Sequence, residues 1–597
     1  MRNRAKGLNY LIVFVAVLQV LQLHCSMADV VSYDWRITSL YSEYDGVFIH
    51  SIGINDKPAD QAVIDVVLGQ EVEVRVTNQI DEPSCLHWHG LKQLGTQEMD
   101  GSSEITQCHI APNGTAVYHF QPDKAGTFWW HSHHMSQYAY GLRGPLIVRT
   151  PANQQQSWMK DIDAEFVVQM ADLYHREPLQ VRMWDNILIN NRGRYSCVAA
   201  AHHNFTKCTD NQPLSKLHFQ AGQKYLLRLI NMAALSPIEF SIDGHDFQVV
   251  VADGDQLQPS EFINSVTLNT GHRYDIIVEA KSPAHQEAMG SFWMRANGLH
   301  GLPWTRGNAT TAGEGYTYEG LAVISYESGG EIGATSLTKR DEVYPTSTKQ
   351  EKLTTVSEFD FKPQLPIVLP EIPADRVVVE FKMENGLGHI AIDGGQYHHF
   401  VHPTEAPLFS IAKGLTTEQL PVEANARKIE YGKHIEVVLV NIKDEQHPFH
   451  MHTHSPWVVG CGVASIEHVR KKILPSPKLI NPMTRDVYTV PPCTSDNNGG
   501  CLDVGYLVLR FNADNPGVWI FHCHIDWHLE AGLSMIFVEG EKELRQKGLK
   551  AFSNSILSVC SSNDENTSPY LKKKHGHRTY TENYGSESNL QGHFADE

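Results

Sequence analysis

Alternating apolar and polar positions recur in matched segments along the chain. Three segments share a glycine, an alternating run and an asparagine nine residues after the glycine: GQEVEVRVTN at 69–78, GQKYLLRLIN at 222–231 and GKHIEVVLVN at 432–441. An aromatic segment follows each of them: GTFWWHSH at 126–133, GSFWMRAN at 290–297 and GVWIFHCH at 517–524. A period of two residues predicts strands with one buried face. Two matched strands in the same order at three places predict three homologous β domains.

The copies also set the expected domain boundaries. We expect β domains at 29–155, 156–327 and 365–545, joined by a linker at 328–364. Residues 546–597 are expected to form a C-terminal segment that ends in a disordered tail. The 44 glycines and 29 prolines favour short strands and turns over helices. The predicted fold class is therefore all-β, with sandwich or barrel domains.

The N-terminus has the pattern of a secretory signal. Basic residues precede an apolar run at 8–23, and Ser26 and Ala28 have the small side chains that signal peptidase accepts. A membrane anchor is the alternative, but the run is shorter than a span of ~20 residues and is broken by glutamines. We expect residues 1–28 to be removed, the mature chain to have no membrane span, and the protein to be secreted and extracellular.

The cysteines fit an oxidising compartment. Of the ten, Cys25 leaves with the signal and Cys523 is set aside as a metal ligand, which leaves an even number for disulfides. Short separation favours two pairings, and the other four cysteines are expected to pair over longer range: Cys197 with Cys208, Cys493 with Cys501, and Cys85, Cys108, Cys461 and Cys560 among themselves. Sequons that fit a secreted glycoprotein occur at Asn113, Asn204, Asn308 and Asn566.

Charge narrows the class of partner. The chain has 49 basic and 68 acidic residues, a formal net charge of −19, which repels phosphate backbones. Nucleic acid is therefore excluded as a partner, and small molecules or cations are expected. The 33 histidines are more than packing requires in a protein of this size, and they are clustered.

The clusters are His-x-His pairs. Residues i and i+2 of a strand share a face, so each pair directs two imidazoles at one object. Four pairs occupy repeat-equivalent places in the first and third copies: His87 and His89, His131 and His133, His450 and His452, and His522 and His524. The middle copy has Arg295 and Asn297 instead, so the strand does not need imidazoles to fold. Eight imidazoles suit a cluster of about three metal ions, with copper favoured over zinc.

A second set of metal ligands overlaps the fourth pair. Cys523 lies between His522 and His524 and must point to the opposite face of the strand, where His447 and His528 can reach it. Two imidazoles and a thiolate are the ligands of blue copper sites. A disulfide is the alternative for Cys523. One strand would then connect both metal sites through a few covalent bonds.

At these residues the sequence resembles the multicopper oxidases, the family of laccases, ascorbate oxidases and ferroxidases. The motifs HWHG, HSH, HPFHMH and HCHIDWHLEAGL occur in order across the chain. The resemblance implies three consecutive cupredoxin-like domains and four copper ions: one type 1, one type 2 and a type 3 pair. It also implies reduction of dioxygen to water, coupled to one-electron oxidation of a small-molecule reductant.

The resemblance assigns each ligand by its place in a motif. It implies type 1 ligands at His447, Cys523 and His528; type 2 ligands at His87 and His450; and type 3 ligands at His89, His131 and His524 on one copper and His133, His452 and His522 on the other. It places the axial residue of the type 1 site at Leu533, which cannot coordinate copper. The thioether of Met535 is the rival. The sequence departs from the family at Thr453, where glycine is usual, so the local turn is in question.

The resemblance also implies two carboxylates beside the histidine cluster. We expect Asp526 to donate protons to reduced dioxygen, and Asp100 to act as a charge and hydrogen-bond partner for a water ligand of the cluster. A turn residue is the alternative for each. We expect a monomer that oxidises phenols or aromatic amines, as laccases do. The acid that laccases use to accept a phenol's proton cannot be carried over, because the corresponding stretch has Leu235 near that place and Glu239 four residues later.

Three other functions remain open. A ferroxidase is possible because the acidic surface would attract Fe(II), with Glu239 or Asp243 as a relay. An ascorbate oxidase is the second alternative. A copper-binding ectodomain without turnover is the third, although the complete ligand set argues against it.

Overall fold

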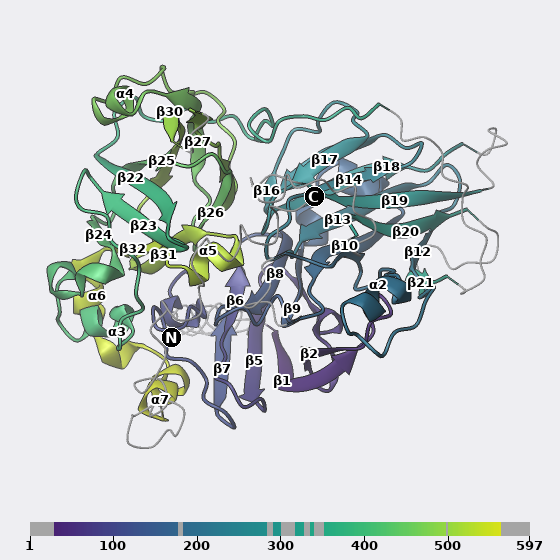
Figure 1. Cartoon of the computed structure of the whole chain (residues 1–597). Helices are drawn as coiled ribbons and strands as arrows, with labels where there is room; N and C mark the ends of the chain where they lie inside the picture. The colour runs from purple at the N-terminus through teal and green to yellow at the C-terminus, as the bar shows by residue number, and fades with distance from the viewer. Residues whose placement is uncertain are drawn as a thin grey trace, which may run out of the picture.

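Three β sandwiches follow one another along the chain in a computed structural model (Figure 1). The structure describes residues 29–176, 183–282, 290–299, 317–326, 335–338, 352–496 and 500–562. The expected signal at 1–28 and the tail beyond 562 lie outside this part of the chain. Within it, no helix is both long and apolar enough to cross a bilayer.

The first sandwich packs a five-stranded sheet against a four-stranded one. The strands of the larger sheet are β1 (Val30–Ser42), β2 (Ile49–Ile54), β3 (Lys57–Pro58), β5 (Glu71–Asn78) and β7 (Thr115–Phe120). Those of the smaller sheet are β4 (Ile64–Val67), β6 (Leu86–His89), β8 (Gly126–Ser132) and β9 (Arg143–Arg149).

The second sandwich has two six-stranded sheets. One contains β10 (Ala164–Leu173), β11 (Asn186–Ile189), β13 (Lys224–Asn231), β15 (Phe247–Ala252), β16 (Asp255–Gln256) and β18 (Arg273–Glu279). The other contains β12 (Ser215–His218), β14 (Ile238–Ile242), β17 (Ser265–Leu268), β19 (Ser291–Gly298), β20 (Glu319–Ser325) and β21 (Thr335–Leu337). β21 lies in the range expected to be a linker, yet it pairs with β12 of this sandwich.

The third sandwich also has two sheets. The first contains β22 (Asp375–Glu384), β23 (Leu387–Ile392), β25 (His434–Asn441), β27 (Trp457–Ala464) and β30 (Cys501–Asn512), with β29 (Thr494–Ser495) beside β30. The second contains β24 (Ala426–Ile429), β26 (His447–Met451), β28 (Val487–Val490), β31 (Gly517–Cys523) and β32 (Ser534–Glu539). The helices are short: α2 (Cys197–His202), α3 (Pro407–Ala412), α4 (Ile466–Arg470), α5 (Asp526–Glu530), α6 (Glu541–Lys547) and α7 (Asn554–Ser562).

The repeat asparagine has the same structural role in all three sandwiches. Asn78, Asn231 and Asn441 are fully buried at the ends of β5, β13 and β25. Each side-chain amide donates to one backbone carbonyl in the loop just beyond and to a second one that is distant in sequence. Each amide oxygen accepts the N–H two residues on. Buried loop backbone needs such partners. The asparagine therefore fixes the turn after the strand, which in the first and third sandwiches leads to a His-x-His pair.

The disulfides differ from the expectation in part. Cys197 pairs with Cys208, and Cys493 with Cys501, as separation predicted. Of the four cysteines expected to pair over longer range, only Cys108 and Cys560 do so, which joins α7 to the first domain. Cys85 and Cys461 are unpaired. The even count therefore misled the prediction, because Cys85 is buried in the first domain while Cys461 lies on β27 of the third.

Candidate metal centre

Cys523 meets two imidazoles inside the third domain. Its Sγ lies 3.6 Å from Nδ1 of His447, the first residue of β26, and 3.5 Å from Nδ1 of His528 on α5. The two Nδ1 atoms are 3.1 Å apart, and all three side chains are buried. Burial lowers the pKa of His447 to about 3, so its ring is neutral. The three residues that the sequence assigned to the type 1 site are therefore together, as a compact N₂S donor set.

Leu533 lies across the sheet from Cys523. The Cys523 N–H donates to the Leu533 carbonyl at 3.1 Å, one step beyond the paired residues His522 and Ser534 of β31 and β32. Residues directly opposite in an antiparallel ladder project to the same face. Met535 instead lies opposite Phe521, two pairs along the ladder from Cys523. The register therefore favours Leu533 over Met535 as the neighbour of the thiolate.

A glycine on the β22–β23 hairpin packs over Leu533. The N–H of Gly388 donates to the Ala531 carbonyl at 2.7 Å, and a Cβ at 388 would lie 2.6 Å from the Leu533 Cβ. Phe381 on the same hairpin contacts the ring of His447 edge-on. The hairpin thus covers the N₂S set and excludes water from it.

The eight histidines of the four pairs converge between the first and third domains. All are at most 8% exposed. His89 stacks on His450 with 3.9 Å between ring centroids, and His87 stacks on His452 at 4.0 Å. This crossed stacking is what a pseudo-twofold pairing of the two domains would produce. β6 and β8 bring one half of the set, and β26 and β31 bring the other (Figure 1).

The ring nitrogens of this set are arranged for metal ions. In four rings Nδ1 lies within 2.9 Å of a backbone carbonyl: His87, His131, His450 and His522. Buried Nε2 atoms have no hydrogen-bond partner among the described residues in His87, His131, His133 and His450. An imidazole that binds a metal through one nitrogen commonly donates the N–H of the other nitrogen to a carbonyl or carboxylate, as the Nδ1 atoms do here. The pattern therefore fits metal ions at the unpartnered nitrogens.

Separate groups within the set could each hold an ion. The imidazoles of His133, His452 and His522 offer nitrogens within 4.8 Å of one another, which is the second type 3 set expected from the sequence. The other expected set is His89, His131 and His524, whose ring centroids lie 4.9 to 5.7 Å from one another. His87, His450 and His452 form a further compact group. Burial is the main cause that keeps the pKa of most of these rings well below 6.5, and repulsion between the rings is the next, so these imidazoles are neutral.

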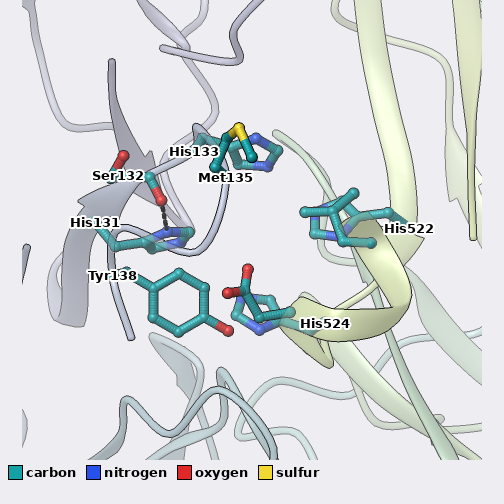
Figure 2. Close-up of a pocket in the computed structure, with 9 residues that line it drawn as sticks. His131, Ser132, His133, Met135, Tyr138, His522 and His524 are labelled. Atoms are coloured by element: carbon teal, nitrogen blue, oxygen red, sulfur yellow. Dashed lines mark hydrogen bonds between the residues drawn. The ribbon is translucent and has the colours of Figure 1, made fainter. Parts of the chain in front are cut away.

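A small cavity opens beside the histidines. Figure 2 shows His131 and His133 on one side and His522 and His524 on the other, with Tyr138 and Met135 also lining it. Asp526 lines the same cavity, and its backbone N–H donates to the Ala234 carbonyl of the second domain at 2.9 Å. Burial raises the pKa of this carboxyl well above its usual value, and one of its oxygens has no partner among the described residues.

Asp100 contacts two imidazoles directly. Its Oδ2 lies 2.9 Å from Nδ1 of His452 and accepts from the Ser102 hydroxyl at 2.6 Å, while its carbonyl oxygen is 2.7 Å from Nδ1 of His87. The expectation from the sequence was a partner for a water ligand. The structure adds an orienting role for two rings, which no motif indicated.

Sequence reasoning also missed Asp486. Its carboxylate lies 3.1 Å from Nε2 of His89 and forms a bidentate ion pair with Arg273 of the second domain. Neither residue is near a histidine motif in the sequence. What marks them is that two side chains of opposite charge are buried together, and this is visible only when the domains are assembled.

The second domain contains the residues that we considered, from the sequence, for interaction with the reductant. Leu235, near the place where laccases have the phenol-binding acid, is fully buried, and its N–H donates to Asp172. Asp243 is held in a bidentate ion pair by Arg295, with both oxygens within 2.9 Å of the guanidinium. Glu239 on β14 is half-buried. Asp243 is therefore already neutralised.

Comparison with known proteins shows which family has this sequence and fold. Family models described as multicopper oxidase match residues 39–153, 156–328 and 396–543. The chain is 31% identical over 473 residues to a laccase of Pycnoporus cinnabarinus, covering 76% of this chain and 79% of that protein. It is 30% identical over 493 residues to Laccase-2 of Botryotinia fuckeliana (80% and 76%) and 27% identical over 537 residues to the iron transport multicopper oxidase fio1 of Schizosaccharomyces pombe (85% and 76%).

Solved structures agree with these matches. The laccase from Botrytis aclada superposes with a TM-score of 0.70 at 26% identity, covering 90% of this chain and 92% of that one. The multicopper oxidase Fet3p, which functions in iron import, has the same fold, with a TM-score of 0.72 at 23% identity over 89% and 95%. The all-β fold with three cupredoxin-like domains is confirmed. The chain belongs to the multicopper oxidase family and is a copper-dependent oxidoreductase that uses dioxygen.

Proposed function

We propose that this protein is a secreted, monomeric, laccase-like oxidase of phenols or aromatic amines. One electron at a time would enter at the N₂S set and leave at the histidine cluster, where dioxygen is reduced to water. Copper bound at these residues supplies the one-electron transfer and the reduction of dioxygen. The rest of the proposal concerns what the side chains of this protein do.

The ligand assignment follows the groups described above. One type 1 copper would be held by Cys523, His447 and His528. The eight histidines would hold three more coppers, with His87 and His450 on the type 2 ion and two sets of three on the type 3 pair: His89, His131 and His524, and His133, His452 and His522. Four coppers per chain is the expected stoichiometry. The unpartnered, buried nitrogens support it.

The position of Leu533 opposite Cys523 is the observation that best supports the proposed class of substrate. An isobutyl group opposite Cys523 would offer a type 1 copper no further donor atom, and the Gly388 backbone packs over that group. Loss of the weak axial ligand favours Cu(I) and raises the reduction potential. A high potential is what oxidation of phenols and aromatic amines requires, because they are poorer reductants than ascorbate.

The covalent route between the sites is short. His522 on β31 and His524, one residue past its end, flank Cys523. Because neighbouring side chains of an extended chain alternate, both point away from Cys523, and both line the cavity of the cluster. Nδ1 of His522 is also 2.9 Å from the Cys523 carbonyl oxygen. An electron on the thiolate therefore reaches a cluster ligand through the backbone or through this hydrogen bond.

Protons would come from the acid in the cavity. Asp526 lines the same small space as four cluster histidines, and it is the carboxyl group there. A general acid must lie within hydrogen-bond reach of the group it protonates, directly or through one water. We assign the proton-donor role to Asp526, and to Asp100 the role of holding the rings of His87 and His452.

Ferroxidase activity is the second candidate. The similarity to an iron transport oxidase favours it, as does the net charge of −19. The ion pair of Asp243 with Arg295 counts against it, because a carboxylate already neutralised by a guanidinium is a poor cation ligand. Glu239 remains the acid that could serve.

Dioxygen uptake separates these functions. The purified holoprotein is given a methoxyphenol, an aromatic amine, Fe(II) or ascorbate at equal concentration, and kcat/KM is compared. The proposal expects the phenol and the amine to exceed Fe(II) and ascorbate by at least tenfold. A preference for Fe(II) that Glu239→Gln removes would establish the ferroxidase instead, and no uptake by a four-copper protein would leave the copper-binding ectodomain.

A further inference from the structure

All three domains meet at one buried ion pair. Asp486 precedes β28 in the third domain, Arg273 begins β18 in the second, and His89 ends β6 in the first. Both guanidinium Nη atoms lie 2.6 Å from the carboxylate oxygens of Asp486. The side chains of the pair are at most 2% exposed.

The carboxylate determines which nitrogen of His89 faces the cluster. Oδ1 of Asp486 lies 3.1 Å from Nε2 of His89, so the ring turns Nδ1 inward, to 3.2 Å from Nε2 of His524. Five other rings do the reverse, with Nδ1 outward against a backbone carbonyl or Asp100. Asp486 also uses its backbone carbonyl, 2.9 Å from Nδ1 of His450. One residue thus orients a histidine from each of two domains.

Arg273 holds Asp486 in this orientation, and it is fixed in turn. Its Nε donates to the Thr127 carbonyl at 3.2 Å, one Nη donates to the Gly271 carbonyl at 3.0 Å, and its backbone N–H donates to Asp253 at 2.8 Å. Asp253 is itself paired with Arg485, the residue before Asp486. The fork geometry of a guanidinium makes such a bidentate pair rigid.

The glycine of the HWHG motif makes room for the pair. Gly90 has φ +95°, and a Cβ there would lie 2.5 Å from Nη2 of Arg273 and 2.9 Å from Oδ2 of Asp486. Any side chain at 90 would therefore push the ion pair away from His89. Glycine is therefore needed at position 90 for close contact with Arg273 of the second domain as well as for the turn.

We propose that Arg273 is a positioning residue of the histidine cluster. The second domain supplies none of the eight histidines, but its guanidinium orients Asp486, and Asp486 selects the inward nitrogen of His89. The inference rests on the proposed copper cluster. It predicts that weakening the ion pair loosens copper at the cluster while copper at Cys523 is retained.

Arg273→Lys tests this in the full-length holoprotein. Lysine keeps the charge but cannot form the bidentate fork. We expect a blue protein that gives up cluster copper to a competing chelator 10- to 100-fold more readily than the wild type, which is the usual range for such orienting partners. We also expect an altered type 2 electron paramagnetic resonance signal, because Asp486 also contacts the ring of His450, which is assigned to the type 2 ion. Asp486→Asn, which preserves shape, should shift the same signal.

Arg228→Lys is the matched control. Arg228 is another arginine of the second domain. It pairs with the buried Asp275 and also contacts Thr127, but among the described residues it has no hydrogen bond to a histidine. It should retain four coppers and the wild-type type 2 signal. Two results would overturn the proposal in favour of a purely stabilising ion pair. One is that Arg273→Lys retains its copper and shows unchanged signals. The other is that both Arg273→Lys and Asp486→Asn fail to fold while Arg228→Lys folds. Fewer than four coppers in the wild type would instead overturn the proposed cluster.

Discussion

The backbone N–H of Cys523 donates to the carbonyl of Leu533, which fixes an isobutyl group opposite the thiolate. The contact joins the last residue of β31 to the residue before β32, and α5 with His528 lies in the loop between them. The side chain opposite the Cys523 thiolate is thus set by strand register. Its identity can be changed without altering the ligands.

Leu533→Met should lower the reduction potential of the type 1 site. A thioether opposite Cys523 can coordinate weakly and stabilise Cu(II), which an isobutyl group cannot do. A redox titration of the blue band measures the effect. Met535→Leu is the control, because Met535 lies opposite Phe521. A rise in potential in the control, with no change in Leu533→Met, would identify Met535 as the ligand.

Cys523→Ser should abolish the intense visible band and substrate oxidation while the protein stays folded. The thiolate is the source of the blue colour and the entry to the covalent route to His522 and His524. Copper content, the visible spectrum and circular dichroism test this together. Cys461→Ser is a suitable control, since Cys461 is also an unpaired cysteine of the third domain. A variant at 523 that kept the blue band would rule out this ligand.

Asp526→Asn should slow reoxidation of the fully reduced enzyme by dioxygen, by about 10²-fold or more as for other general acids. Reduction of the type 1 site by substrate should keep its normal rate, because Asp526 lines the cavity beside the cluster histidines. Stopped-flow measurement of the two half-reactions separates these effects. Asp526→Glu should restore much of the rate. Equal slowing of both half-reactions would point to impaired folding or copper loading.

Much of this site could be predicted because its signals are local. A His-x-His pair and a cysteine between two histidines reveal their faces through the period of a strand alone. The ion pair of Arg273 with Asp486 has no such signal, since 213 residues separate its partners and only domain assembly brings them together. Cys85 shows the same limit, because a count of cysteines carries no information about which ones are buried apart.

The departure at Thr453 is explained by its backbone. Thr453 follows His452 with φ 64°, in the left-handed region that β-branched residues rarely adopt. Glycine adopts this region without strain, which accounts for the family's preference at this place. The threonine hydroxyl lies 3.1 Å from Nδ1 of His454, a contact that offsets part of the strain.

Thr453→Gly should therefore stabilise the protein by about 1 kcal/mol, since left-handed strain costs 1–3 kcal/mol and the added freedom of unfolded glycine returns part of it. Loss of the hydroxyl leaves Nδ1 of His454 beside the His452 carbonyl, also at 3.1 Å, so no buried donor is stranded. Thermal unfolding of the copper-loaded protein measures the change. Asn385→Gly is the control, because Asn385 has φ 52° but asparagine tolerates that region, and its gain should be smaller. A lower unfolding temperature in Thr453→Gly would show that the hydroxyl contact outweighs the backbone strain, and that threonine is the better residue for this turn.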